Sequence, residues 1–307
     1  MMFLFTTESW GHRMVLAASR RMVARFLVVA VAAVAVSCAD ESAPGPDYVV
    51  GAGDSVESDL LAQIYAGALA RTGLRVSVET GLGDRAAALA ALDAGTVSLL
   101  GEHNGDLLEF FDSGATARKP DDVKEALYGS LPEGLVVADA ADGTDLRPRV
   151  LISTAAGVRS VAQLGERCAG TVAVAPVPVW LAPAGPVRVA ACDLDFAAVE
   201  PMRPGPLLEA LRDGRIQVGV LSGPPIGLAA DALRGVTVLT DDEYAVRARN
   251  VLPVFRKGSL NEVRVKKLNY VGGELTTEEF VELVRRITAG EVSSADAARA
   301  WLDAHAL

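Results

Sequence analysis

Hydrophobic and polar positions change their period along the chain, and each change predicts an element. The apolar run of YVVG (48–51) indicates a buried strand. From Val56 to Arg71, apolar residues recur at every third or fourth position, as in an amphipathic helix. RVSVE (75–79) alternates like a strand, Arg85–Ala94 has helical spacing, and Val97–Leu100 is a short apolar run. The order β-α-β-α-β is typical of a parallel sheet with helices on its faces.

One local plan occurs twice in the sequence. ALDAGTVSLL (91–100) and ALRDGRIQVG (210–219) each combine a helix end, a glycine and a short strand. The first copy runs into GEHNG (101–105) and the second into VLSGPPIG (220–227). Two copies favour two similar lobes, and ligands of parallel sheets bind at the carboxyl ends of strands. We therefore expect the two loops to face each other across a cleft.

Further strands and helices complete both lobes. Strands are expected at RVLIS (149–153), TVAVA (171–175), 236–239 and 251–255, and helices between Thr276 and His305. We expect the chain to pass between lobes near residue 149 and to return near residue 252, and two such crossings form a hinge. The predicted domains are a first lobe of residues 48–149 and 252–307 and a second lobe of residues 150–251.

The first 37 residues predict an export signal rather than part of the fold. Arginines precede a run of apolar residues, and Phe26–Val36 is shorter than the roughly 20 residues that span a bilayer. Met14 and Met22 each open a plausible signal. Residues 35–38, Ala-Val-Ser-Cys, resemble the lipobox of bacterial lipoproteins, which implies a lipid on Cys38. An ordinary signal peptide with an incidental cysteine is the alternative. Residues 38–47 would then form a polar tether that holds the body off the membrane.

Charge and composition exclude several function classes. The net charge is −10, and the first 37 residues carry four arginines and one glutamate, so the remainder carries −13. Such an acidic body argues against nucleic-acid binding, which needs clustered Lys and Arg. The sequence has no nucleophile elbow, no phosphate-binding loop with Lys and no His/Cys cluster for zinc, so we expect no enzyme activity, cofactor or metal. In an exported protein, Cys168 and Cys192 favour a disulfide, with two buried thiols as the alternative.

Three segments carry a family resemblance: VVGAGDSVESDLLAQIYAGALARTG (49–73), LGDRAAALAALDAGTVSLLGEHNGDLLEF (82–110) and NVLPVFRK (250–257). They resemble the substrate-binding lipoproteins of ABC importers for glycine betaine, choline and related osmoprotectants. The resemblance implies an α/β, type II periplasmic-binding-protein fold whose two lobes close on a small solute. It also implies ABC permease and ATPase subunits as partners, and we expect a monomer anchored by its lipid on the extracytoplasmic side of the membrane. A non-transport sensor or partner-binding lipoprotein is the alternative function.

The family holds a quaternary ammonium group in a cage of tyrosines, whose ring faces attract a cation that cannot donate hydrogen bonds. The family's Glu-Tyr-Thr-Gly-Thr motif stands here as Glu-His-Asn-Gly-Asp (102–106). Four tyrosine positions of the cage fall on or near His103, Arg149, Ser222 and Arg249, and none of these residues is aromatic. We therefore expect that the cage is lost. Because arginine suits a carboxylate or phosphate, the solute is predicted to be polar, anionic or zwitterionic.

The remaining candidate ligand contacts lie in loops. Gly53, Asp54 and Ser55 follow the first strand, where backbone N–H groups can receive an anion, although helix capping explains them equally well. Asn104 and Asp106 are candidates in the same sense, as polar residues at a helix start. Trp180, in a proline-rich loop, is either a ligand-stacking residue or part of a lobe core.

Overall fold

The computed structural model describes residues 48–164, 172–175, 202–226, 228 and 231–307. Several predicted features lie outside the described residues, namely the signal segment, Cys38 and the tether, Cys168, Trp180 and Cys192. In the part of the chain that the structure describes, no helix is both long and apolar enough to cross a membrane.

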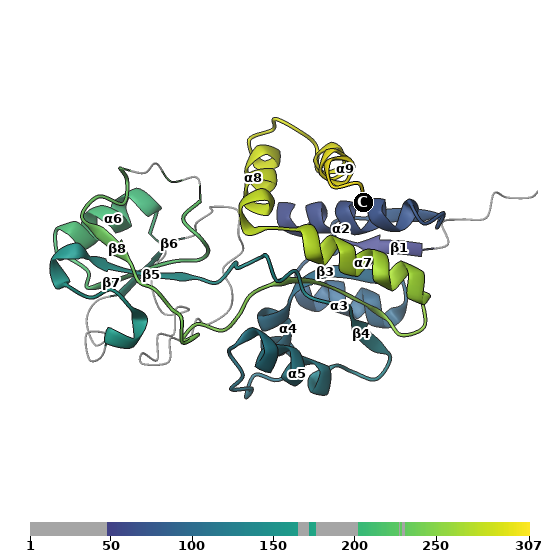
Figure 1. The fold of residues 1–307 in the computed structure, drawn as a ribbon, viewed down its shortest axis with the longest axis horizontal. Helices are drawn as coiled ribbons and strands as arrows, with labels where there is room; N and C mark the ends of the chain where they lie inside the picture. The colour runs from purple at the N-terminus through teal and green to yellow at the C-terminus, as the bar shows by residue number, and fades with distance from the viewer. Residues whose placement is uncertain (1–47, 165–171, 176–201, 227, 229–230) are drawn as a thin grey trace, which may run out of the picture. The chain divides into compact units, whose positions relative to one another are not determined.

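The first sheet has the strand order β2-β1-β3-β9-β4 (Figure 1). Its strands are β1 (Tyr48–Gly51), β2 (Val76–Glu79), β3 (Leu99–His103), β4 (Leu135–Val137) and β9 (Val251–Arg256). β1 pairs in parallel with β2 and β3, which confirms the β-α-β-α-β unit that the N-terminal pattern predicts. β9 lies antiparallel between β3 and β4, so a strand from late in the chain completes the sheet.

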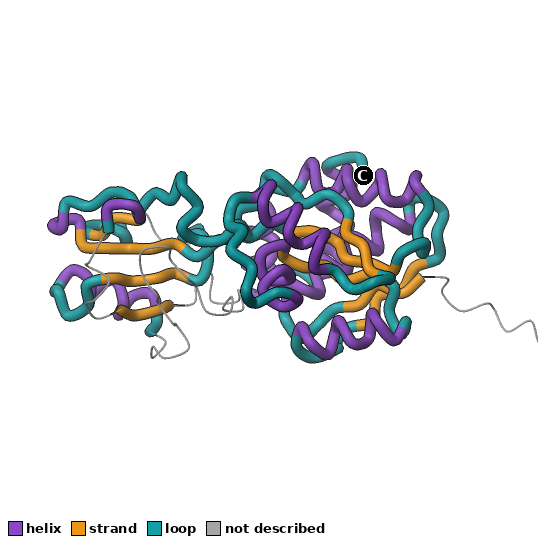
Figure 2. Tube along the Cα trace, turned by 90° about the horizontal axis from the view of Figure 1, so that it is seen from below, coloured by secondary structure: helices purple, strands orange, loops and turns teal. Residues whose placement is uncertain are grey.

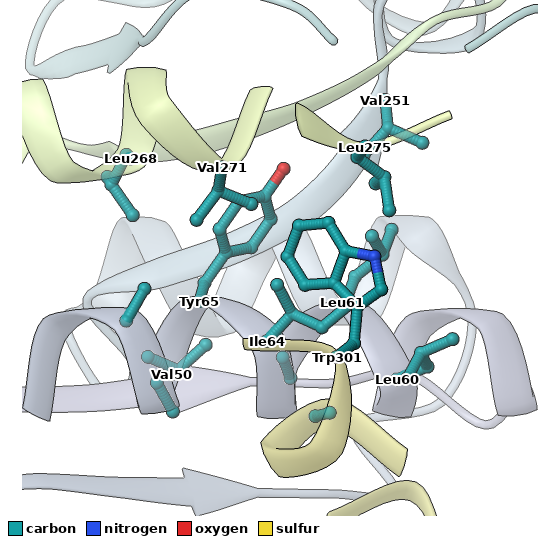
Figure 3. Packing of buried hydrophobic residues seen from close by; sticks show 14 of the residues in the cluster. Val50, Leu60, Leu61, Ile64, Tyr65, Val251, Leu268, Val271, Leu275 and Trp301 are labelled. Carbon is teal, nitrogen blue, oxygen red and sulfur yellow. The ribbon is translucent and has the colours of Figure 1, made fainter. Parts of the chain in front are cut away.

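Helices cover both faces of the first sheet (Figure 2). They are α2 (Val56–Ala70), α3 (Arg85–Ala94), α4 (Asn104–Phe111), α5 (Pro120–Ser130), α7 (Glu262–Glu274), α8 (Thr277–Thr288) and α9 (Ser294–Ala304). Neighbouring strand residues face opposite ways, so Leu99 joins the core beneath α2 whereas Leu100 joins the core beneath α3 and α4. Figure 3 shows Ile64 and Tyr65 of α2 packed among Val271 of α7 and Trp301 of α9. This packing joins the middle of α2 to the C-terminal helices and to the core beneath the sheet.

The second sheet of the described residues has the strand order β6-β7-β5-β8. Its strands are β5 (Arg149–Ser153), β6 (Val172–Ala175), β7 (Val218–Leu221) and β8 (Val236–Val238), and its helix is α6 (Pro204–Arg212). β7 is parallel to β6 and antiparallel to β5. Alternation again separates two cores, because Val150 packs on one face and Leu151 on the other. These elements agree with the strands that the sequence predicts for the second lobe, while the exact lobe boundaries stay a prediction.

The helix–glycine–strand segment that occurs twice in the sequence has the same turn geometry in both places. α3 ends at Ala94 and has Gly95, with φ 78°, as its C-cap, and the turn after α6 reaches Gly214 with φ 72°. In each copy the two residues after the glycine donate their N–H groups to one helix carbonyl, that of Ala91 or that of Ala210. Only glycine adopts this left-handed conformation readily, so the glycine sets where each helix stops and each strand begins.

The strand predicted at Val97–Leu100 begins two residues later and ends three residues later than expected. Residues 101–103 belong to strand β3 and not to a loop, and α4 begins directly at Asn104. The reason is that β3 pairs with β9 along its whole length, from Leu99 to His103. Gly101 permits this because a Cβ there would lie 2.5 Å from Cβ of Leu61 on α2. The consequence is that Glu102 and His103 have a fixed backbone.

Candidate functional site

A cavity of about 460 Å³ lies at the carboxyl ends of β1 and β3. The loop between β1 and α2 forms one wall, and the start of α3 forms another. The end of β3, the first turn of α4 and Arg249 complete it. This is the edge of an α/β sheet at which ligands bind. The sequence placed Gly53, Asp54, Ser55, His103, Asp106 and Arg249 among the candidate contacts, and all six line this one cavity.

A buried carboxylate and a buried imidazole meet at the cavity wall. Oε1 of Glu57, in the first turn of α2, lies 2.9 Å from Nε2 of His103 at the end of β3. The side chains are 4% and 8% exposed. The two atoms lie within ion-pair distance, and neither atom makes a hydrogen bond of normal geometry among the described residues. Buried polar atoms are rarely left without a hydrogen bond, so the pair calls for an explanation, and a bound solute is one.

A second set of charges lies beside this pair. Nε of Arg249 donates to Oδ2 of Asp106 at 3.0 Å, and Nη2 of Arg85 donates to the same oxygen at 3.2 Å. Nε of Arg85 also contacts both oxygens of Glu102, at 3.1 and 3.2 Å. Arg249 is only 3% exposed, so its charge is not solvated and is instead balanced by Asp106. The two arginines are thus held in place by carboxylates.

The surrounding charges lower the pKa values of two carboxyl groups of the cavity, those of Asp106 and Glu57. Burial by itself raises the pKa of Asp106, but Arg249, His103 and Arg85 outweigh this effect and lower the pKa to about 2. Burial likewise raises the pKa of Glu57, and attraction to His103 and Arg249 more than offsets it, so the pKa lies below its ordinary value. Both groups are therefore carboxylates at neutral pH.

The loop after β1 is held by its own hydrogen bonds. The N–H of Gly53 donates to Oγ of Ser58, and the N–H of Asp54 donates to the carbonyl of Gly83. Oγ of Ser55 accepts the N–H of Ser58 and so caps α2. Capping therefore accounts for Ser55, and two of the N–H groups expected to receive an anion are already engaged.

Other candidates from the sequence lie elsewhere. Asn104 is buried and pairs with Asn250. The side-chain amide of Asn104 donates to Oδ1 of Asn250, and the backbone N–H of Asn250 donates to Oδ1 of Asn104. Arg149 lines a different cavity, of about 270 Å³, and contacts Asp145. Ser222 is buried directly after β7. The structure thus places Arg249 and His103 in one cavity and Arg149 in another.

The sequence pattern did not point to Glu57 or Arg85 as ligand contacts, yet both line the cavity. A buried acid in the first turn of a helix resembles an ordinary dipole-stabilising residue in sequence. A sign in the sequence was the motif at residues 102–106, whose two acidic residues need cations once they are buried. Arg85, at the first position of α3, supplies one of them. Among the described residues, no group of His, Cys, Asp and Glu side chains is arranged to hold a metal ion.

Comparison with known proteins identifies a family and a fold for the chain. The model of a family described as the substrate binding domain of ABC-type glycine betaine transport systems matches residues 46–304. No curated protein matches the chain. The solved structure of a glycine betaine/carnitine/choline ABC transporter protein is 16% identical, with a TM-score of 0.60 over 84% of this chain and 98% of that one. Apo YehZ of Escherichia coli is 17% identical, with a TM-score of 0.58 and the same coverage of both chains. These structures show that the fold is that of type II periplasmic binding proteins.

Proposed function

Because the chain belongs to the family of substrate-binding domains of ABC-type glycine betaine transport systems, we propose that its solute binds in the cavity around Glu57 and His103. The family supplies the role, that of the extracytoplasmic solute-binding protein of an ABC importer. The observation that carries the assignment of the site is the buried Glu57–His103 pair, whose facing atoms lack hydrogen-bond partners among the described residues. The position of the pair at the carboxyl edge of the sheet supports the same assignment.

We further propose that the solute is small and polar and that it is not held in an aromatic cage. Within the described residues, the lining of the cavity includes no Phe, Tyr or Trp side chain. The position of the family's motif tyrosine is filled by His103, which is engaged with Glu57. A quaternary ammonium group would therefore meet charged and polar groups where the family offers ring faces.

The attachment and the partners complete the proposal. A lipid on Cys38 would keep the protein at the outer face of the membrane, and residues 38–47 would act as the tether. The solute-loaded protein would act as a monomer and deliver its cargo to a permease driven by an ATPase. The lipobox-like Ala-Val-Ser-Cys of residues 35–38 supports the anchor, and the family match supports a permease and an ATPase as partners.

A thermal-shift screen tests the site. The purified protein is scanned with glycine betaine, choline, carnitine, amino acids, dicarboxylates and sugars. A ligand at 100 times its dissociation constant stabilises the folded state by about 2.7 kcal/mol, which gives a measurable shift. We expect a polar solute to give this shift and His103→Gln to abolish it. His305→Gln, at the C-cap of α9 and outside the cavity, is the matched control and should leave the shift intact. A shift that survives His103→Gln unchanged would move the solute to another site.

A further inference from the structure

The wall of the cavity around Glu57 carries more negative than positive side chains. Its lining has five carboxylates and two arginines, together with His103. The carboxylates are those of Asp54, Glu57, Asp84, Glu102 and Asp106, and the arginines are Arg85 and Arg249. The described wall is therefore net negative even when His103 is protonated. Such a wall repels an anion and attracts a group with positive charge.

Four of the five carboxylates already have protein partners that donate hydrogen bonds. Glu102 and Asp106 accept from the arginines. Asp54 accepts the N–H of Gly83 at 3.2 Å, and Asp84 caps α3 by accepting the N–H of Ala87 at 2.9 Å. These contacts explain why the four side chains lie where they do without invoking a ligand.

Glu57 differs from the other four carboxylates. Its contact is with His103, and an imidazole, unlike a guanidinium, is not obliged to carry a charge. Its Oε1 has no aligned donor among the described residues, although the residue is only 3% exposed. The other charged groups around it are Arg249, from the segment before β9, and Asp106, from the first turn of α4. A buried carboxylate with an unused oxygen is the acceptor that a charged donor would stabilise most.

The described wall of the cavity has no aromatic ring, and this indicates which kind of nitrogen group the solute carries. A fully methylated nitrogen has no hydrogen to donate and is bound through ring faces, which the described lining does not provide. An ammonium group that keeps hydrogens can donate directly to a carboxylate. We propose that the solute carries a primary or secondary ammonium group and that Glu57 is its acceptor. This inference rests on the proposed function and names the class of solute, a zwitterion or cation with N–H donors.

Two methylation series test the proposal with the thermal-shift assay and with calorimetric titration. The first is glycine, sarcosine, dimethylglycine and glycine betaine, in which one N–H hydrogen is replaced at each step. The second is ethanolamine, dimethylethanolamine and choline, which lack the carboxylate. We expect the affinity to fall along each series as hydrogens are replaced. The largest shift from betaine or choline would overturn the proposal, as would the absence of a shift from every member that retains an N–H.

Variants of one side chain separate the charge of Glu57 from its packing. Glu57→Gln should weaken the binding of the best N–H-bearing solute about tenfold or more, since a hydrogen bond to a charged group contributes roughly 1.5–3 kcal/mol. Glu57→Asp keeps the charge and should retain the preference for N–H-bearing solutes. Glu125→Gln, the same change on the exposed face of α5, is the matched control and should bind as the parent protein does. The unfolding midpoint without ligand shows that each variant is folded.

The outcomes also separate this inference from the proposed function. A betaine-induced shift that is lost in His103→Gln would keep the site and overturn the ammonium assignment. A glycine-induced shift that is unchanged in both Glu57→Gln and His103→Gln would overturn both. Loss of the preference in Glu57→Gln together with its retention in Glu57→Asp is the result that supports the assignment.

Discussion

Asp106 is the residue on which the charges of the cavity converge. Its Oδ2 accepts from Arg249 and from Arg85, and Nδ1 of His103 lies 4.0 Å away. A buried ion pair is not in itself strongly stabilising, because its desolvation offsets most of the attraction. Removing one partner is costly, however, since the other charge is then buried alone. The network therefore stabilises the fold only as a complete set.

Replacing Asp106 by asparagine tests this cooperativity. We expect Asp106→Asn to lower the free energy of unfolding by about 3–5 kcal/mol, because Arg249 loses its buried counter-charge. Asp213 forms an exposed pair with Arg215 in the turn after α6, with side chains 62% and 58% exposed. Asp213→Asn should change the free energy by less than about 1 kcal/mol. Urea unfolding of both variants measures the difference, and equal effects would show that the cavity pair is no better coupled than the surface pair.

The pKa of Asp106 predicts a loss of stability in acid. Its pKa in the folded protein is lowered to about 2, from an ordinary value of 3.8. The carboxylate thus contributes stability that is fully present above about pH 4 and is lost as the pH falls towards 2. We expect the free energy of unfolding of the parent protein to fall between pH 4 and pH 2 by more than that of Asp106→Asn, on the order of 2 kcal/mol more. Parallel curves for the two proteins would contradict this assignment.

At the scale of elements, the contact between β3 and α2 positions the site. Glu57 lies in the first turn of α2 and His103 at the end of β3, so their separation depends on how closely the helix approaches the strand. Gly101 sets this approach, because a Cβ there would meet Leu61 of α2 at 2.5 Å. A side chain at this position would push the helix and the strand apart and would disturb the Glu57–His103 contact.

Two glycine-to-alanine changes examine that packing. Gly101→Ala should destabilise the protein by about 1–3 kcal/mol, as overpacking of a core does, and it should weaken solute binding. Gly129 lies in α5, and a Cβ added there would meet no described atom within 4 Å. Gly129→Ala should therefore be neutral or stabilising by roughly 0.5–1 kcal/mol, the helical advantage of alanine over glycine. Thermal unfolding and the ligand-induced shift measure both effects. A Gly101→Ala variant with unchanged stability would show that α2 can move away from β3 at no cost.

The sequence predicts elements better than it predicts contacts between them. The strands at Tyr48–Gly51 and Arg149–Ser153 and the helix Arg85–Ala94 have the predicted bounds, because their periodicity and caps are local. The loop expected at residues 101–103 is a strand, since its partner β9 comes from about 150 residues later in the chain and is set by tertiary pairing. The pairing of Arg85 with Asp106 likewise joins elements that local patterns treat separately.

At the scale of the whole molecule, charge and attachment are linked. Without its first 37 residues the chain carries a net charge of −13. An acidic body is repelled by the anionic lipids of a membrane surface, so electrostatic attraction would not hold it there. Of the residues that the structure describes, none belongs to a helix able to span a bilayer. The lipid proposed for Cys38 would offset this repulsion through the burial of its acyl chains.

Replacing the proposed lipid-bearing cysteine tests this role of the lipid. In cells that export the protein, we expect the parent chain in the membrane fraction and Cys38→Ser in the soluble extracytoplasmic fraction, because serine cannot carry the thioether-linked lipid. Cys168→Ser, which keeps residues 35–38 intact, is the matched control and should stay with the membrane. A high-salt wash should not release the parent chain, since salt screens charges but does not weaken the burial of acyl chains. Retention of Cys38→Ser in the washed membranes would mean that another part of the chain provides the anchor.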